Sequence, residues 1–345
     1  MLRQPGDGRR KESQRALRTS GIRSSVDSAR IRPQTTNRLR QIRSQVLLFD
    51  GGLNRATSYT ELIMNNLRSK YGQFALVTGA SSGMGAEFAR QLAEAGLDLV
   101  LVARRRSKLE EIAEELHAKF DTRVEIVELD LLDEGAIDEL TMRTEELDIG
   151  LLVLAAGVFT AGPFTTNELS AETEVVTLNA IRPMQLTHRY SGMFVERGRG
   201  GIILVASTVG HQAAPYLANY AATKAYVATL GQALSYELKR SGVDLTVLSP
   251  GPTNTEGVQT AEGIDFSKLP LPMMKPDAVV SKALKGLGRR ALVVPGPTNK
   301  IMDVMAKYFS PRPVLTRMFG LLLSRSLDRD PNTSRNPVGP TAGNP

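Results

Sequence analysis

Short apolar runs alternate with amphipathic stretches over most of the chain. Seven apolar runs follow one another from position 74 on: 74–78, 97–103, 124–129, 150–155, 201–206, 243–249 and 291–295. Between them, apolar residues recur at helical spacing, as over 85–95, 107–120 and 220–240. Strands that are apolar throughout are typical of parallel sheets covered by helices on both faces. The pattern therefore predicts an α/β fold with a doubly wound parallel sheet of about seven strands, whose ligands bind at the carboxyl ends of the strands.

The alternation ends near residue 295, and the remaining chain is predicted to be a helical extension. Two helices are expected over 301–309 and 313–327, and the Pro-, Asn- and Gly-rich stretch 328–345 is expected to be frayed. The second helix carries an extended apolar run with flanking arginines. It either packs on the body of the protein or on a second subunit, or lies in a membrane interface. Packing is the favoured interpretation, and a peripheral membrane contact is the alternative.

The first 44 residues are rich in Arg, Ser, Gln and Thr, contain no aromatic residue and show no apolar periodicity. A disordered tail is the favoured interpretation, ahead of a basic transit peptide and of a nucleic-acid-binding arm. Residues 45–70 are predicted to form an amphipathic helix with Leu62, Ile63 and Leu67 on its apolar side.

The basic character of the chain comes from this N-terminal segment. The net charge of the whole chain is +7. Residues 1–70 hold 15 Lys and Arg against 5 Asp and Glu, a balance of +10, so the rest of the chain has a balance of −3. A nucleic-acid partner is therefore not expected for the folded body.

The composition excludes several kinds of site. Without cysteine there are no disulfides, thiol nucleophiles or cysteine-ligated metals. His117, His188 and His211 show no ligand spacing, so no metal site is expected. No apolar run reaches the ~18 residues of a membrane-spanning helix, and the N-terminus lacks the apolar stretch of a secretory signal. We expect a cytoplasmic protein, with organellar targeting by the N-terminal segment left open.

A glycine-rich turn follows the first predicted strand and opens the first predicted helix. It reads Thr-Gly-Ala-Ser-Ser-Gly-Met-Gly over 78–85. Glycines allow a tight turn and let backbone N–H groups approach a pyrophosphate at a helix N-terminus. Any tight turn can contain glycines, so the position between strand and helix gives this signal its weight. The residues expected to bind the cofactor here are Gly79, Ser81, Ser82, Gly83, Met84 and Gly85.

The end of the second predicted strand indicates which dinucleotide binds. NAD sites place an acidic side chain there for the ribose hydroxyls, whereas this strand runs into Arg104, Arg105 and Arg106. A guanidinium can bind a 2′-phosphate with two hydrogen bonds. Three solvated arginines are the alternative, but positive charge is unfavourable beside a helix N-terminus. We therefore expect NADP(H), bound by Arg104 together with Ser82 or Arg105.

Three further residues indicate acid–base chemistry. Tyr220 and Lys224 lie four positions apart, on one face of a predicted helix. A free tyrosine has a pKa of ~10, and a neighbouring ammonium lowers that pKa, which suits general acid–base catalysis. Ser207 ends the fifth predicted strand, at the same sheet edge as the glycine turn. Each signal alone is weak, and together they predict an active site.

These motifs, in this order, resemble the short-chain dehydrogenase/reductase family over roughly residues 72–295. The matching motifs are Thr-Gly-x-x-x-Gly-x-Gly at 78–85, Ser207, Tyr-x-x-x-Lys at 220–224 and Pro-Gly-x-x-x-Thr at 250–255. The resemblance implies a single Rossmann-type domain and hydride transfer between NADP(H) and a carbonyl or secondary alcohol. It also implies a homo-oligomer and a small-molecule substrate.

The resemblance implies a role for each matching residue. Tyr220 donates the proton in reduction, Lys224 lowers its pKa and holds the nicotinamide ribose, and Ser207 orients the substrate oxygen. Asn179 matches an asparagine that sustains a proton relay. The nicotinamide side of the cofactor is expected beside Pro250, Gly251, Thr253 and Thr255.

The stretch after the fourth strand departs from the family pattern. Where the family has Asn-Asn-Ala-Gly or Asn-Ala-Gly, this chain has Leu-Ala-Ala-Gly at 154–157. Ala155 and Ala156 keep the close backbone approach that Gly157 marks, but the side-chain amide bonds are absent. Ala156 and Gly157 are expected to bind the cofactor. Asp130, after the third strand, is expected either to accept a hydrogen bond from adenine or to cap the next helix, for which Asp133 is better placed.

The substrate pocket is expected between segments that follow these strands: His211, Gln212 and Tyr216, the stretch 159–164, and a lid over 256–274. Its Met and aromatic residues suggest an apolar ketone, a 3-oxoacyl chain or a steroid-like substrate. The alternative is a catalytically weak nucleotide-binding scaffold or regulatory protein of the same fold. An enzyme is favoured because the four catalytic candidates occur together.

The expected organisation has four parts. Residues 1–70 form a basic, disordered extension, 71–295 the Rossmann-type catalytic domain, 296–328 the C-terminal helical extension, and 329–345 a disordered tail.

Overall fold

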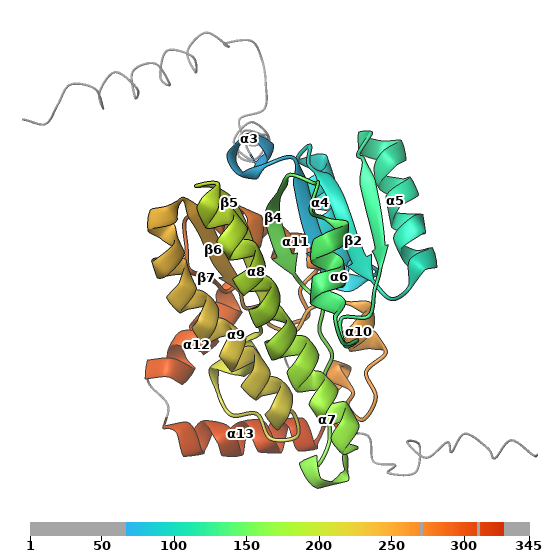
Figure 1. Cartoon of the computed structure of the whole chain (residues 1–345). Coiled ribbons are helices and arrows are strands. Elements are labelled where there is room, and N and C mark those ends of the chain that lie inside the picture. The colour runs from blue at the N-terminus through green and yellow to red at the C-terminus, as the bar shows by residue number, and fades with distance from the viewer. Residues whose placement is uncertain (1–66, 270–271, 309–310, 328–345) are drawn as a thin grey trace, which may run out of the picture. The chain divides into compact units, whose positions relative to one another are not determined.

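A computed structural model of the chain describes residues 67–269, 272–308 and 311–327. Within them, parallel strands form one seven-stranded sheet in the order β3-β2-β1-β4-β5-β6-β7 (Figure 1). The strands are β1 (Phe74–Thr78), β2 (Asp98–Ala103), β3 (Val124–Glu128), β4 (Ile149–Leu154), β5 (Gly200–Val205), β6 (Val243–Leu248) and β7 (Leu292–Val293). Each overlaps a predicted run, so the predicted doubly wound parallel sheet is confirmed.

Helices connect the strands and continue beyond the last one. They are α3 (Leu67–Tyr71), α4 (Gly83–Glu94), α5 (Arg106–Phe120), α6 (Ala136–Arg143), α7 (Leu169–Val176), α8 (Arg182–Glu196), α9 (Ala218–Glu237), α10 (Glu256–Gln259), α11 (Pro276–Gly286), α12 (Pro297–Tyr308) and α13 (Arg312–Ser324). The predicted helices correspond to α4, α5, α9, α12 and α13. Helix α8 was not predicted, although Leu186, Tyr190 and Phe194 recur at helical spacing and are buried. Helices α6, α7, α10 and α11 were not predicted either.

Both faces of the sheet are buried, which explains why its strands are apolar throughout. In β1, Ala75 and Val77 pack in a cluster with α4, α5 and α11. Phe74 and Leu76 point to the other face, where they pack with α6, α8 and α9. Successive side chains of a strand point to opposite faces, so a strand covered on both sides contains no polar alternation.

The strand order reverses between β1 and β4. The two strands pair directly, although β2 and β3 come between them in the sequence. The connections that follow β1 and β4 therefore leave the sheet in different directions and open a crevice at its carboxyl edge. This is where the glycine turn and the end of β4 meet.

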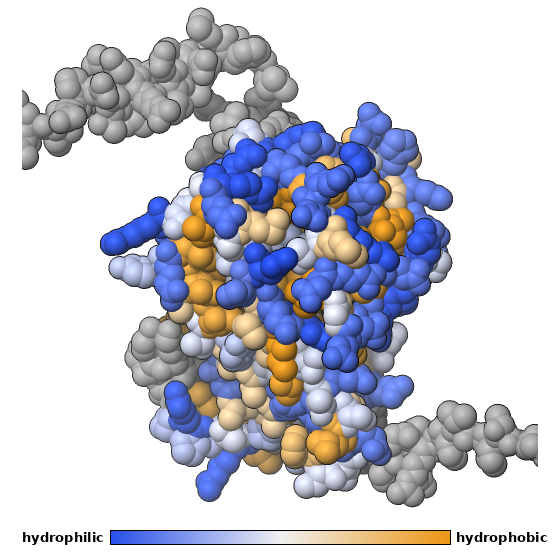
Figure 2. All heavy atoms as spheres, viewed as in Figure 1, coloured by the Kyte–Doolittle hydropathy of each residue, from blue (hydrophilic) through white to orange (hydrophobic). Residues whose placement is uncertain are grey.

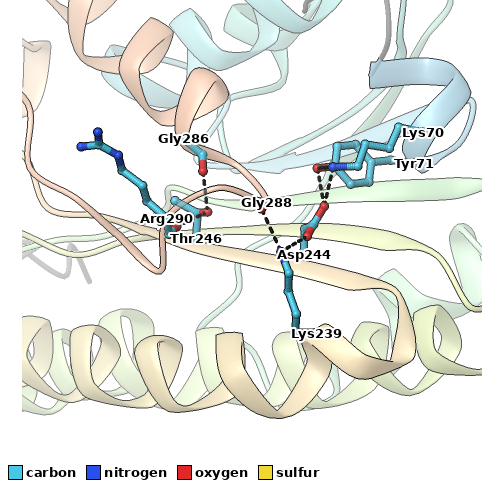
Figure 3. A network of polar contacts seen from close by, with 8 residues as sticks. All are labelled: Lys70, Tyr71, Lys239, Asp244, Thr246, Gly286, Gly288 and Arg290. Atoms are coloured by element: carbon cyan, nitrogen blue, oxygen red, sulfur yellow. Dashed lines mark hydrogen bonds and ion pairs between the residues drawn. The ribbon is translucent and has the colours of Figure 1, made fainter. Parts of the chain in front are cut away.

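The first described helix is anchored to the opposite edge of the sheet. Asp244, near the start of β6, accepts hydrogen bonds from Lys70 at 2.6 Å, from the Tyr71 hydroxyl at 3.0 Å and from Lys239 at 3.3 Å (Figure 3). Leu67 of the predicted helix over 45–70 is buried in α3. Residues 67–70 of that prediction are helical in α3. Its part over 45–66, with Leu62 and Ile63, lies outside the described residues, as do the predictions for 1–44 and 328–345.

The C-terminal helices pack on the carboxyl side of the sheet. Phe319 and Leu323 of α13 are buried in a small cluster with Leu217, Ala221 and Ile264. The favoured interpretation of the second C-terminal helix, packing on the body of the protein, is therefore correct for one of its faces. No helix in the described part of the chain is both long enough and apolar enough to cross a membrane.

Candidate active site

The glycine turn between β1 and α4 forms a cradle in which side chains have no room. Gly79 and Gly83 adopt positive φ angles of 67° and 55°, a conformation that favours glycine. A Cβ at Gly85 would lie 2.1 Å from the carbonyl oxygen of Gly79. The N-cap residue of α4, Ser82, makes no side-chain capping bond. The first N–H groups of α4 are thus available to an anion, which fits a pyrophosphate.

A cavity of about 360 Å³ lies over this turn. It is lined by the turn, by the ends of β2, β3 and β4, and by residues from two later segments. Its predicted lining residues are Gly79, Ser81, Ser82, Gly83, Met84, Gly85, Arg104, Asp130, Ala156, Gly157 and Thr255. Leu178 and Val158 line it as well. Glycines, a free helix N-terminus and cationic side chains fit a nicotinamide dinucleotide.

The three arginines after β2 have different partners. Arg104 is 64% exposed and only approaches Asp130, at 3.4 Å. Arg105 forms two hydrogen bonds with Glu256 of α10, at 2.8 and 3.0 Å. Arg106 pairs with Glu110 on the outer surface of α5. Arg104 therefore has the guanidinium least engaged by the protein itself.

From the sequence, Glu256 was expected only as the first residue of the substrate lid, with no role at the cofactor site. Its hydrogen bond with Arg105, supported by one with Ser82, lowers its pKa to about 2, so it is ionised at neutral pH. The pair joins the turn after β2 to a segment about 150 positions later in the chain. No local pattern marks a contact over such a separation.

Asp130 does not cap a helix. Its carboxylate accepts the backbone N–H of Leu132 at 2.9 Å and faces the dinucleotide cavity. Helix α6 begins at Ala136 after Gly135, with no side-chain cap. Asp133, the preferred candidate for a cap, does not act as one.

The Thr78 hydroxyl holds the backbone at the end of β4, where this chain lacks the asparagine amides of the family pattern. It accepts the N–H groups of Ala155 and Ala156 at 3.1 and 3.3 Å. A Cβ at Gly79 would lie 2.7 Å from the Ala156 Cα. The end of β4 is therefore held tightly against the glycine turn by a β1 side chain.

Three of the four catalytic candidates come together at the carboxyl edge of the sheet. Ser207 lies two residues after the end of β5, and Tyr220 and Lys224 lie in the first two turns of α9. The Ser207 and Tyr220 side chains are hydrogen-bonded to each other. The Lys224 ammonium lies 5.6 Å from the centre of the Tyr220 ring and donates to the carbonyl of Val205 at 2.9 Å.

Burial controls the proton affinities of this cluster. It raises the pKa of Tyr220 to about 12, although the Ser207 hydrogen bond acts in the opposite direction. Burial also lowers the pKa of Lys224 to about 8. Removal from water is the largest effect on both groups, so the net shift of the Tyr220 pKa is upward. The predicted role of Lys224 in lowering that pKa stays a prediction. Tyr220 keeps its proton at neutral pH, as a proton donor must.

Asn179 lies in a π-helical turn, Thr177–Ile181, between α7 and α8. Its amide donates to the Val158 carbonyl at 2.7 Å and accepts the Val158 N–H at 3.0 Å. A Cβ at Gly157 would lie 2.9 Å from the Asn179 oxygen and 3.4 Å from the Lys224 nitrogen. Asn179 thus holds the chain after β4 beside the lysine. π-turns are often found at functional sites.

A second cavity, of about 240 Å³, opens beside Ser207 and Tyr220. Its predicted lining residues are Phe159, His211, Gln212, Phe266 and Leu269. Much of the remaining wall comes from α12 and α13, which the sequence analysis did not assign to the site: Asn299, Met302, Asp303, Met305, Leu315, Met318, Phe319, Leu322 and Leu323. Most of these side chains are apolar, so the cavity suits an apolar molecule.

His211 links this cavity to α12. Its ring contacts the Asp303 carboxylate at 2.5 Å and the Ser249 hydroxyl at 3.0 Å. His211 lines this cavity, and its place in a substrate pocket stays a prediction. Tyr216 is not among the lining residues and instead adopts a positive φ of 68°.

The Pro-Gly turn after β6 lies apart from the dinucleotide cavity except for Thr255. Gly251 lines the second cavity instead. Thr253 is buried, and its hydroxyl donates to the Gly251 carbonyl at 2.9 Å. Pro250 accepts the N–H of Thr208. Pro250 and Thr253 therefore shape the turn without lining either cavity.

Known proteins share this arrangement. The family model of the short chain dehydrogenases matches residues 73–263. The chain is 32% identical to the 7beta-hydroxysteroid dehydrogenase of Clostridium sardiniense, over 68% of this chain and 90% of that protein. It is also 32% identical to the very-long-chain 3-oxoacyl-CoA reductase of Mycosarcoma maydis, over 73% and 76%.

A solved structure agrees with these matches. The short-chain dehydrogenase from Sphingobium yanoikuyae in complex with NADPH is 35% identical, covers 64% of this chain and 86% of its own, and superposes with a TM-score of 0.60. The family match extends over more than half of the chain and includes the glycine turn, Ser207 and the Tyr220–Lys224 pair. The chain therefore belongs to the short-chain dehydrogenases, and it is an oxidoreductase that uses a nicotinamide cofactor on carbonyl or alcohol substrates.

Proposed function

We propose that the enzyme uses NADP(H) to interconvert an apolar ketone and its secondary alcohol, with Tyr220 as general acid and base. One observation carries the proposal. The hydrogen-bonded Ser207 and Tyr220 line the apolar cavity, and Lys224, in the next turn of α9, lies against Gly157 of the dinucleotide cavity. The proton donor thus lies between the two cavities.

The roles of the side chains follow from this placement. When bound, the reduced nicotinamide supplies a hydride to the carbonyl carbon. The hydroxyls of Ser207 and Tyr220 hold the carbonyl oxygen, and Tyr220 transfers its proton to that oxygen as the negative charge develops. The Lys224 ammonium stabilises the phenolate that remains. Asn179 keeps the Val158 segment and Lys224 in place.

The preference for NADP(H) rests on Arg104. Nothing acidic follows β2 to accept hydrogen bonds from the ribose hydroxyls, and Arg104 faces the dinucleotide cavity with only a long contact to Asp130. A 2′-phosphate would offer this guanidinium a strong, charge-assisted partner. Arg105 lines the same cavity, but its guanidinium is already paired with Glu256.

The lining of the second cavity supports an apolar substrate. Phe159, Leu315 and Phe319 are among its wall residues. Two matched relatives are named for a hydroxysteroid and for a long-chain 3-oxoacyl substrate. We infer a ketone of that kind, bulky and largely hydrocarbon, as the substrate class of this chain.

A substrate panel tests the proposal. Purified enzyme is given NADPH and either a keto steroid, a long-chain 3-oxoacyl thioester or a small polar ketone, and NADPH oxidation is followed. We expect kcat/KM to be at least about tenfold higher for an apolar ketone, because each apolar side chain it contacts favours binding. Binding of NADPH without turnover on any ketone would instead support the nucleotide-binding scaffold.

A further inference from the structure

Helix α13 is apolar on two opposite faces. Its inner face, Leu315, Phe319 and Leu323, is buried against the body of the protein. On the other side, Val314, Met318 and Leu321 are 57%, 50% and 64% exposed. A helix with one buried stripe normally has a polar opposite face. The exposed stripe is not covered by the fold itself, so a further molecule is expected to bind there.

Helix α12 has a second exposed apolar stripe, next to the apolar cavity that Ser207 and Tyr220 line. Ile301, Val304 and Met305 are 65%, 46% and 48% exposed and lie at helical spacing. We call Ile301, Val304, Met305, Val314, Met318 and Leu321 the outer face. Figure 2 shows hydrophobic and hydrophilic side chains side by side along the lower edge of the molecule, where Figure 1 places α13.

The charge around the outer face is positive. Among the side chains that the structure describes, Lys300, Arg312, Arg317 and Arg325 are exposed cations of these helices and their ends. None of the four forms an ion pair with another described residue. The acidic Asp303 is held by His211 at 2.5 Å. Asp265, near the end of α13, pairs with Lys268. Exposed apolar side chains flanked by unpaired cations are complementary to an anionic lipid surface.

The outer face also borders the mouth of the substrate cavity. Met305 and Met318 both line that cavity and are about half exposed. An apolar molecule dissolved in a membrane would therefore meet the cavity where the outer face touches the lipid. At 13 residues, α13 spans about 20 Å, too short for the ~30 Å of a hydrocarbon core, so it would lie along the surface.

We propose that the outer face of α12 and α13 docks on an anionic lipid bilayer and that the substrate enters the cavity from it. The entry route rests on the function proposed above, whereas the docking does not. The favoured interpretation of this helix, packing, accounts for its inner face. Docking accounts for the outer face.

Vesicle binding by the full chain tests the proposal. The protein is sedimented with vesicles of phosphatidylcholine alone and of phosphatidylcholine mixed with phosphatidylglycerol. We expect binding to the mixed vesicles and much weaker binding to the neutral ones. Val314→Glu with Leu321→Glu should lower the partition coefficient about tenfold or more, because two apolar contacts are replaced by two negative charges. Ile301→Glu with Val304→Glu should act in the same direction.

Control variants show whether a loss of vesicle binding is specific to the outer face. Met142→Glu with Tyr236→Glu changes two exposed residues, 68% and 77% accessible, on α6 and α9, and should leave vesicle binding unaltered. None of the residues substituted in the outer-face variants or in this control lines the apolar cavity. NADPH oxidation with a small water-soluble ketone and the Tm should therefore stay near their starting values. Vesicle binding needs no turnover, so it can succeed or fail independently of the proposed function.

Three results would overturn the proposal. The full chain could remain in the supernatant with both kinds of vesicle. The outer-face variants could bind as well as the unaltered chain, which would assign the attachment to another segment, such as the basic N-terminal residues. Finally, the outer-face variants could dissociate a dimer in gel filtration without changing vesicle binding, which would make this face an interface between copies.

Discussion

Burial and pairing give chemically similar residues different properties at this site. Arg104 and Arg105 are neighbours in the chain. Glu256 accepts two short hydrogen bonds from Arg105, whereas Arg104 stays exposed to the cavity. Tyr220 and Lys224 were predictable from their spacing, and so was Ser207 from its position at a strand end. Glu256 and the change in the Tyr220 pKa were not predictable, because both depend on tertiary contacts.

Arg104→Ala should weaken NADPH binding about tenfold and leave NADH binding nearly unchanged. A charge-assisted hydrogen bond contributes roughly 1.5–3 kcal/mol, and only NADPH carries the 2′-phosphate. Fluorescence titration with both nucleotides measures this. Arg106→Ala is the matched control, because Arg106 pairs with Glu110 on the surface. Equal losses for NADPH and NADH in Arg104→Ala would contradict the assignment.

At the scale of elements, the sheet and its main helices follow from the hydrophobic pattern, because both-sided burial and helical periodicity leave direct marks on the sequence. The walls that α12 and α13 contribute to the apolar cavity cannot be predicted from that pattern. Leu315 and Phe319 have the spacing of any packed helix, and only the folded chain places them beside Tyr220. The π-turn that holds Asn179 is likewise invisible, since α7 and α8 simply continue on either side of it.

Gly85→Ala should distort the cradle between β1 and α4. The added Cβ would lie 2.1 Å from the Gly79 carbonyl oxygen, where the backbone must move. We expect a loss of about 1–3 kcal/mol in the free energy of unfolding, as for other overpacked sites, together with weaker dinucleotide binding. Urea denaturation and nucleotide titration measure the two effects.

Gly192→Ala provides the control for this substitution. Gly192 lies in α8 with no atom within 4 Å of an added Cβ, so alanine should be neutral or stabilise the helix by up to about 1 kcal/mol. If Gly85→Ala behaved in the same way, the glycine turn would not be the tight cradle described here.

In the molecule as a whole, the chemistry lies at the carboxyl edge of the sheet and the anchoring of α3 at the opposite edge. Asp244 holds that anchor through Lys70, Tyr71 and Lys239 (Figure 3). Burial alone would raise the pKa of Asp244, but the hydrogen bonds and charges of these partners keep it below its usual value. Sequence patterns indicated the carboxyl edge. They did not indicate this anchor, in which Lys70 and Tyr71 bind Asp244 far along the chain.

Asp244→Asn should lower the free energy of unfolding by about 1–2 kcal/mol near neutral pH. The value is reduced from that of a buried charged hydrogen bond because Lys70 and Lys239 are about half exposed. A carboxyl group with a lowered pKa stabilises the fold above its ordinary pKa, and this contribution is lost as the pH falls through its folded-state value. The difference between the two proteins should therefore shrink below about pH 4.

Urea denaturation at neutral and acidic pH checks this expectation. Glu125→Gln is the matched control, since Glu125 forms an exposed pair with Arg123 and such pairs contribute little. A difference between Asp244→Asn and the unaltered protein that stays constant down to low pH would show that the carboxylate charge is not what anchors α3.

The most direct test of the whole account is single-turnover reduction by Tyr220→Phe. The substitution keeps the ring against Phe159, 5.6 Å away, and removes only the hydroxyl. NADPH should bind with unchanged affinity, while the rate of ketone reduction should fall about 10²- to 10⁴-fold, the range for loss of a general acid. A Tyr220→Phe enzyme that reduces the ketone at close to the original rate would contradict the assignment of Tyr220 as the proton donor.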